Sequence, residues 1–159
     1  MVIWAEILTA GLSWVDLGTF FVSRDQWLKS LPAGKVFTAE RIVYRNLLDG
    51  LDPMIVGGLN NPFKEWIGAL IRTDLYGWIN PGNPKAAAQM AVRDAWLSHR
   101  RNGLYGAAMS AAMNAMAMVT KDIDQVLDAG FSVLPPESAI YKACALTREL
   151  GNSDIDYEL

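Results

Sequence analysis

Residues 66–106 read WIGALIRTDLYGWINPGNPKAAAQMAVRDAWLSHRRNGLYG, and this stretch decides what kind of fold the chain can adopt. Within it, NPGNP at 80–84 cannot continue a helix, because each proline restricts the residue before it and the glycine is free to take a positive φ. Asn83 is predicted to cap the next helix, and a proline suits the first helical turn. That helix should run from Pro84 to Ser98, before a second polar turn at 100–103. Two polar turns thus bracket one helix, an arrangement that looks like the wall of a ligand-binding site.

The remaining sequence also has helical rather than alternating periodicity, which predicts an all-α fold. Thr120 is expected to cap one helix and Gly130 to end it. The alanines and methionines of 103–119 should form the most tightly packed helix, with methionine filling irregular gaps. The predicted helices span about 2–10, 24–30, 38–49, 62–72, 84–98, 103–119, 122–129 and 135–150.

Length and composition favour one compact domain over residues 1–159, with an acidic tail at 151–159. The chain has 159 residues, 52% of them hydrophobic, which can supply a substantial core. A net charge of -3, with Lys and Arg scattered along the chain, offers no basic field for nucleic acid. Six tryptophans are many for this size, and most should be in the core or in an interface.

The single cysteine, the apolar segments and the N-terminal sequence bear on the cellular compartment of the protein. The single cysteine, Cys144, excludes an internal disulfide and a multi-cysteine metal cluster, and its alanine neighbours suggest a buried thiol. No segment has the ~18 consecutive apolar residues that would span a membrane. The N-terminal MVIWAEILTAGL carries Glu6 within its apolar run and does not resemble a secretory signal. A reducing cytoplasm fits these features.

The central segment resembles one branch of the ADP-ribosylglycohydrolase superfamily. That branch reads roughly GA-x-IR-x-D-x-x-G-x-x-NPGNP, followed by A-x-x-RDA-x-x-SH-x-x-NG-x-YGA, and the resemblance covers about residues 20–142. The matching residues here are Gly68, Ala69, Ile71, Arg72, Asp74, Gly77, Asn80 to Pro84, Ala91, Arg93, Asp94, Ala95, Ser98, His99, Asn102, Gly103, Tyr105, Gly106 and Ala107.

The resemblance implies a compact, orthogonal multi-helix fold. It also implies hydrolysis of an N- or O-glycosidic bond of an ADP-ribosyl group, with paired Mg²⁺ held by acidic motifs near the two ends of a longer domain. Neither acidic motif is present, and the segment 152–156 resembles the second only superficially. The resemblance thus implies Mg²⁺ as the cofactor of the family, but this chain lacks the acidic motifs that would bind it. We assign no catalytic or metal-binding residue and expect the isolated chain, a central fragment or a reduced descendant, to be inactive.

The candidate substrate-binding residues lie in the two turns and just beyond them. Backbone N–H groups at the helix start after the first turn, and at the one after the second, could bind a diphosphate or ribose. The resemblance places Ser98 and His99 at the substrate cleft, and Tyr105 could stack on a base. Each also has a structural alternative. The turn residues could simply form their turns, His99 could be a protonated histidine stabilised by a helix C-terminus, and Tyr105 could pack in the core. Arg72, Asp74, Arg93 and Asp94 are expected to be structural. The full candidate set is Asn80, Gly82, Asn83, Ser98, His99, Asn102, Gly103 and Tyr105.

Three functions remain open. The chain could be part of a Mg²⁺-dependent glycohydrolase, a non-catalytic module that binds ADP-ribose or an ADP-ribosylated substrate, or a helical interaction module. We also expect exposed apolar surface, with Trp4 and Trp14 as candidates, and hence self-association or a complementing protein segment.

Overall fold

The computed structural model describes residues 28, 29, 36 and 38–151, and within these residues every regular element is a helix. The all-α prediction is confirmed. The predicted helix at 2–10, Trp4, Trp14 and most of the predicted helix at 24–30 lie outside the described residues. The elements are α3 (Thr38–Leu48), the 3-10 helix η2 (Leu70–Arg72), α4 (Asp74–Trp78), α5 (Pro84–Trp96), α6 (Asn102–Ala117), α7 (Ile123–Ser132) and α8 (Ala139–Gly151).

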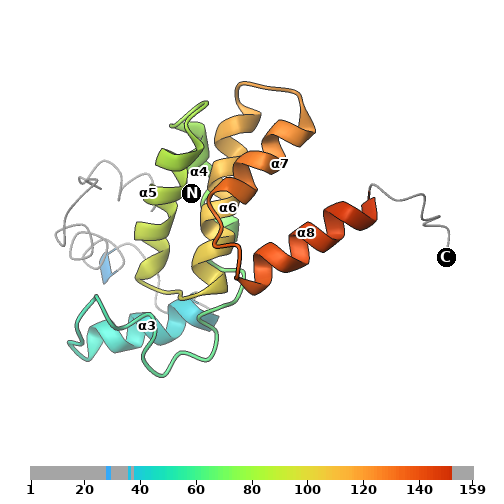
Figure 1. Cartoon of the computed structure of the whole chain (residues 1–159). Coiled ribbons are helices and arrows are strands. Elements are labelled where there is room, and N and C mark those ends of the chain that lie inside the picture. The colour runs from blue at the N-terminus through green and yellow to red at the C-terminus, as the bar shows by residue number, and fades with distance from the viewer. Residues whose placement is uncertain (1–27, 30–35, 37, 152–159) are drawn as a thin grey trace.

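The core lies between α5 and α6, which run side by side, with α4 and α7 packed against α6 (Figure 1). Small side chains let the two helices approach closely, because alanines face each other along the contact. The fully buried alanines include Ala87, Ala91 and Ala95 of α5 and Ala107, Ala111 and Ala115 of α6. The prediction of tight packing is thus confirmed for the alanines of α6, except that Ala117 is exposed. The helix ends at Ala117, and Met118, predicted to fill a gap in the core, is 54% exposed.

The start of α5 forms as the sequence predicts. The Asn83 side chain accepts a hydrogen bond from the Ala86 N–H at 3.1 Å, and Pro84 occupies the first turn. Gly82 takes a φ of +70°, a conformation that favours glycine. Its N–H donates to the Ala115 carbonyl at 2.9 Å, which ties the turn to the end of α6.

The predicted helix over 62–72 is wrong, because residues 62–69 form turns and bends and only Leu70–Arg72 is helical. The Lys64 carbonyl, which a helix would use for the N–H four residues later, accepts from the Arg100 N–H at 2.8 Å instead. Just before it, the Asn61 amide lies 3.1–3.3 Å from carbonyls of three other segments. Tertiary hydrogen bonds of Asn61 and Lys64, beside short local turns, take the place of a continuous helix.

The predicted cap and the predicted end of α7 are also wrong, whereas its predicted start lies within one residue of the observed one. Asp122, not Thr120, caps the helix, since its Oδ1 accepts from the N–H of Asp124 and of Gln125. Gly130 lies inside the helix, which continues to Ser132. A Cβ at position 130 would lie 2.7 Å from Cγ of Met113, so glycine is required here for close packing of α7 on α6 rather than for a helix end.

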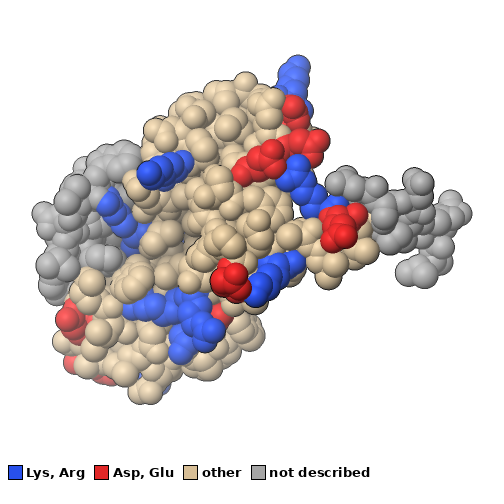
Figure 2. All heavy atoms as spheres, in the orientation of Figure 1, with Lys and Arg blue, Asp and Glu red and all other residues tan. Residues whose placement is uncertain are grey.

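Several surface features complete the fold. Cys144 is half-buried, which corrects the expectation of a buried thiol. Trp66 and Trp78 are about half exposed, at 54% and 46%. None of the described helices is long and apolar enough to cross a membrane. Basic and acidic side chains are interspersed on the face shown in Figure 2.

Candidate functional site

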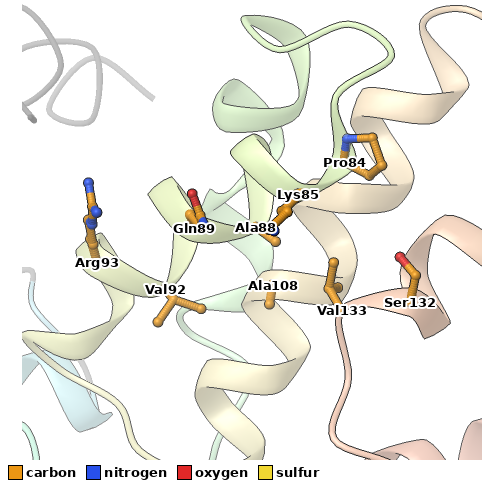
Figure 3. Close-up of a pocket in the computed structure, with 9 residues that line it drawn as sticks. All are labelled: Pro84, Lys85, Ala88, Gln89, Val92, Arg93, Ala108, Ser132 and Val133. Carbon is orange, nitrogen blue, oxygen red and sulfur yellow. The ribbon is translucent and has the colours of Figure 1, made fainter. Parts of the chain in front are cut away.

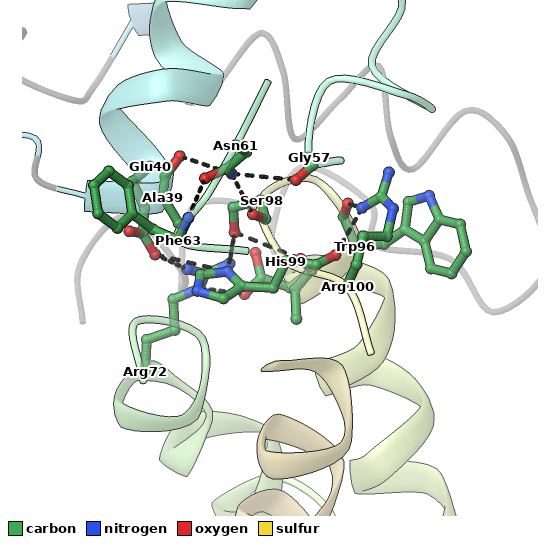
Figure 4. Close-up of polar contacts among 12 residues, drawn as sticks. Ala39, Glu40, Gly57, Asn61, Phe63, Arg72, Trp96, Ser98, His99 and Arg100 are labelled. Carbon is green, nitrogen blue, oxygen red and sulfur yellow. Dashed lines mark hydrogen bonds and ion pairs between the residues drawn. The ribbon is translucent and has the colours of Figure 1, made fainter. Parts of the chain in front are cut away.

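A buried polar network centred on Arg72 joins α3, η2 and α5 (Figure 4). The guanidinium donates from Nε to Oδ2 of Asp94 at 2.8 Å and from Nη1 to Oε1 of Glu40 at 2.7 Å. It also donates from Nη2 to Oγ of Ser98 at 2.9 Å. Arg72 is 5% exposed, and Asp94 and Ser98 are fully buried. Burial alone would lower the pKa of Arg72, but Asp94 and Glu40 outweigh it and raise that pKa above its ordinary value.

His99 extends this network without carrying a charge. Its Nδ1 lies 2.7 Å from Oγ of Ser98, and the residue is fully buried just beyond α5. Burial, reinforced by Arg72 and Arg100, lowers the pKa of His99 to about 3. The imidazole is therefore neutral at neutral pH, so its 3.9 Å approach to Glu40 is no ion pair. This corrects the alternative in which the helix end favours the positive form, because desolvation outweighs the helix dipole here.

The second turn, 100–103, is held by contacts within the chain. Asn102 donates from its Nδ2 to Oε2 of Glu65 at 2.8 Å, and its backbone N–H also points at that oxygen, at 3.4 Å. The carboxylate of Glu65 therefore occupies the place that an anionic ligand would take at the start of α6. Gly103 is buried, and a Cβ there would lie 2.6 Å from the Lys64 carbonyl. Tyr105 is half-buried and packs on the core.

The first turn, 80–83, is more open. Gly82 and Asn83 are exposed, and Asn80 donates from its Nδ2 to the Tyr76 carbonyl at 2.8 Å. Few backbone N–H groups at the start of α5 are available to a ligand. Pro84 has no N–H, and the N–H groups of Ala86 and Ala87 both donate to Asn83.

The structure places the two turns at opposite ends of α5. A helix of 13 residues spans about 20 Å at ~1.5 Å per residue, so the predicted residues form two separate groups. Asn80, Gly82 and Asn83 lie at the start of α5, whereas Ser98, His99, Asn102, Gly103 and Tyr105 lie beyond its end.

A cavity of about 610 Å³ lies between α5, α6 and the end of α7, beside the first turn (Figure 3). Its apolar lining comes from two helices and the residue after α7: Ala88 and Val92 of α5, Ala108 of α6 and Val133. The polar lining comprises Lys85, Gln89 and Arg93, which are spaced four residues apart on one face of α5, together with Ser132. Pro84 connects the cavity to the turn.

Sequence reasoning missed both arrangements. The spacing of Lys85, Gln89 and Arg93 could have identified a polar face on α5. No local signal could have identified the Arg72 network, because Glu40, Arg72 and Asp94 belong to three elements far apart in the sequence.

Comparison with known proteins gives a family match. The family model for ADP-ribosylglycohydrolase matches residues 2–157, nearly the whole chain. Neither a curated protein nor a solved structure matches. The family match supports an ADP-ribosylglycohydrolase-like function in general terms. By the extent of that match, and with an all-helical structure consistent with it, the chain belongs to the ADP-ribosylglycohydrolase family.

Proposed function

We propose that this chain binds the ADP-ribosyl group at the α5 cavity, beside the 80–83 turn, and does not cleave it by itself. The observation that carries this proposal is the position of the cavity next to the turn in a chain of this family. Its volume of about 610 Å³ is within the ~300–1,000 Å³ typical of small-molecule sites.

The lining of the cavity suits the two chemical parts of such a ligand. Lys85 and Arg93 are cations eight positions apart on α5, about 12 Å at ~1.5 Å per residue, and can attract a diphosphate. Ala88, Val92 and Val133 offer apolar contact for a base or ribose face. The Lys85 N–H adds a donor at the helix start, where the dipole favours an anion.

Within the proposal, the eight sequence-predicted residues have different roles. Gly82 and Asn83 are exposed and can contact ligand directly, with Asn80 fixing their turn. Ser98 and His99 have no exposed surface, so we propose that they stabilise the far end of α5 rather than touch the ligand. Asn102, Gly103 and Tyr105 belong to the same supporting group.

Hydrolysis by the family is metal-dependent, and the described residues do not fit a metal. No group of three or more His, Cys, Asp or Glu side chains within 38–151 is arranged to hold an ion. The carboxylate of Asp94, on α5, accepts a hydrogen bond from Arg72. We therefore propose no role for Mg²⁺ at these residues, and we expect the pure chain not to release ADP-ribose from a modified peptide. Release that a chelator abolishes would contradict this expectation.

Lys85→Gln should weaken binding of ADP-ribose about fivefold, equivalent to roughly 1 kcal/mol, because it removes one charge-assisted contact. Arg45→Gln is the matched control, since Arg45 is exposed on α3 and does not line the cavity. Both variants should keep the helical circular dichroism spectrum. Equal affinity of the Lys85→Gln variant, the control and the parent chain, measured by calorimetry, would exclude the α5 cavity as the binding site.

A further inference from the structure

Helix α8 stands at the edge of the molecule and projects away from the α4–α7 body (Figure 1). None of its residues is buried. One side contacts α7: Arg148 bridges Asp124 and Asp128 at 2.7 and 2.6 Å, and Tyr141 meets Phe131 edge-on at 5.3 Å between ring centroids. The opposite side of α8 therefore faces away from α7, while the first turns of α8 also approach α6.

The side of α8 that faces away from α7 carries a regular apolar stripe. Ala139, Ala143, Leu146 and Leu150 are spaced by four, three and four residues, the repeat of a helix–helix seam. All four are exposed, Leu146 at 56% and Leu150 at 44%. Contiguous exposed apolar surface of this kind is typical of an interaction site.

The stripe continues onto a neighbouring segment. A cavity of about 400 Å³ at the start of α8 is lined by Ala139 and Ala143 on one side and by Trp66 and Ile67 on the other. Trp66 and Ile67 are 54% and 62% exposed. We call the stripe and these two residues together the α8 surface.

We propose that a second copy of this chain covers the α8 surface, by antiparallel packing of α8 against α8 about a two-fold axis. In this register Ala143 lies opposite Leu146 of the second copy, and Ala139 lies opposite its Leu150. Each contact joins a small side chain to a large one and occurs twice by symmetry. Leu150 of the second copy then reaches the cavity beside Trp66 and Ile67.

Charge complementarity favours a second copy of the chain as the partner and an antiparallel arrangement of the two α8 helices. Lys142 and Glu149 flank the stripe on the same side, and the antiparallel register brings Lys142 next to Glu149 of the second copy, again twice. A parallel pair would not join these two residues. In the single chain Lys142 lies 3.0 Å from Glu137, but both are well exposed, at 63% and 91%, so that contact exchanges easily. Complementary charges give direction and specificity more than affinity.

Trp66 and Ile67 add apolar area that the short helix α8 lacks by itself. With 13 residues, α8 is about 20 Å long at ~1.5 Å per residue, too short for a stable isolated helix pair. The added apolar area beside the cavity brings each side closer to the ~800 Å² that a specific interface buries per partner.

Sedimentation velocity over a range of micromolar concentrations tests the proposal on the full chain. The parent chain should form a dimer, and Leu146→Glu should raise its dissociation constant about tenfold or more, because it places a charge within the seam. Leu48→Glu is the matched control, since Leu48 is 63% exposed on α3 and outside the α8 surface. A strictly monomeric parent chain overturns the proposal, as does a dimer that Leu146→Glu leaves intact.

Charge reversal tests the register. Lys142→Glu and Glu149→Lys should each weaken the dimer, because each places like charges together twice, whereas the double variant should restore the parent association. A double variant as weak as the two single variants overturns the antiparallel register. Circular dichroism on every variant checks that the helices remain.

Discussion

Arg72→Met should lower the free energy of unfolding by about 3–5 kcal/mol, the typical cost of leaving buried charges without their partner. Arg72 is 5% exposed and donates to Asp94, Glu40 and Ser98, so the substitution strands one fully buried carboxylate and one largely buried one. The loss should appear as a lower midpoint in urea unfolding followed by circular dichroism.

Arg148→Met is the matched control, because Arg148 also bridges two carboxylates but on the surface, with the side chains of Asp124 and Asp128 78% and 68% exposed. Stability should barely change there, since water replaces the lost partner. Arg72→Lys should fall between the two, because lysine keeps the charge but cannot donate to three groups in one plane. Equal effects of Arg72→Met and Arg148→Met would contradict the central role of the network.

The second large effect is a loss of stability in mild acid that depends on His99. Folding lowers the pKa of His99 from 6.5 to about 3, so the unfolded chain binds a proton more readily than the folded chain. The stabilisation is complete above pH 6.5 and is lost as the pH falls towards 3, at about 1.4 kcal/mol per pH unit. At pH 5 the chain should have lost about 2 kcal/mol relative to neutral pH.

The measurement is urea unfolding at several pH values between 7 and 5. His99 is the only histidine in the chain, so no other side chain has an ordinary pKa in this range. His99→Gln should be less stable at neutral pH but should lose most of the slope. A slope that persists in His99→Gln would mean that another group is responsible.

The sequence predicted the elements whose signals are local. Asn83, Gly82 and Pro84 act within a few residues of each other, and the structure forms their turn and cap as expected. The alanines of α6 follow helical periodicity and are buried for that reason. Where the capping residues and the helical periodicity agree, a single sequence is enough to predict the helix.

The errors arose where distant segments override local preference. The carbonyl of Lys64 bonds to Arg100 across the fold, which removes the helix predicted over 62–72. Gly130 looks like a helix end but is needed for the approach of α7 to Met113. The partners of Arg72 are 22 to 32 positions away along the chain, so no motif could reveal them. The substrate-binding roles assigned to the residues of the two turns stay predictions, and only the structure shows that the turns are separated by the length of α5.

Calorimetric titration of the full chain with ADP-ribose, with and without Mg²⁺, tests the proposed function most directly. In the proposed function, Lys85 and Arg93, which line the α5 cavity, would bind the ligand together with the neighbouring 80–83 turn, and none of these needs a metal. We therefore expect one ADP-ribose bound per chain, with the same affinity in Mg²⁺ and in chelator. No binding in either condition, or binding that appears only with Mg²⁺, would contradict a metal-independent ADP-ribosyl site in this chain.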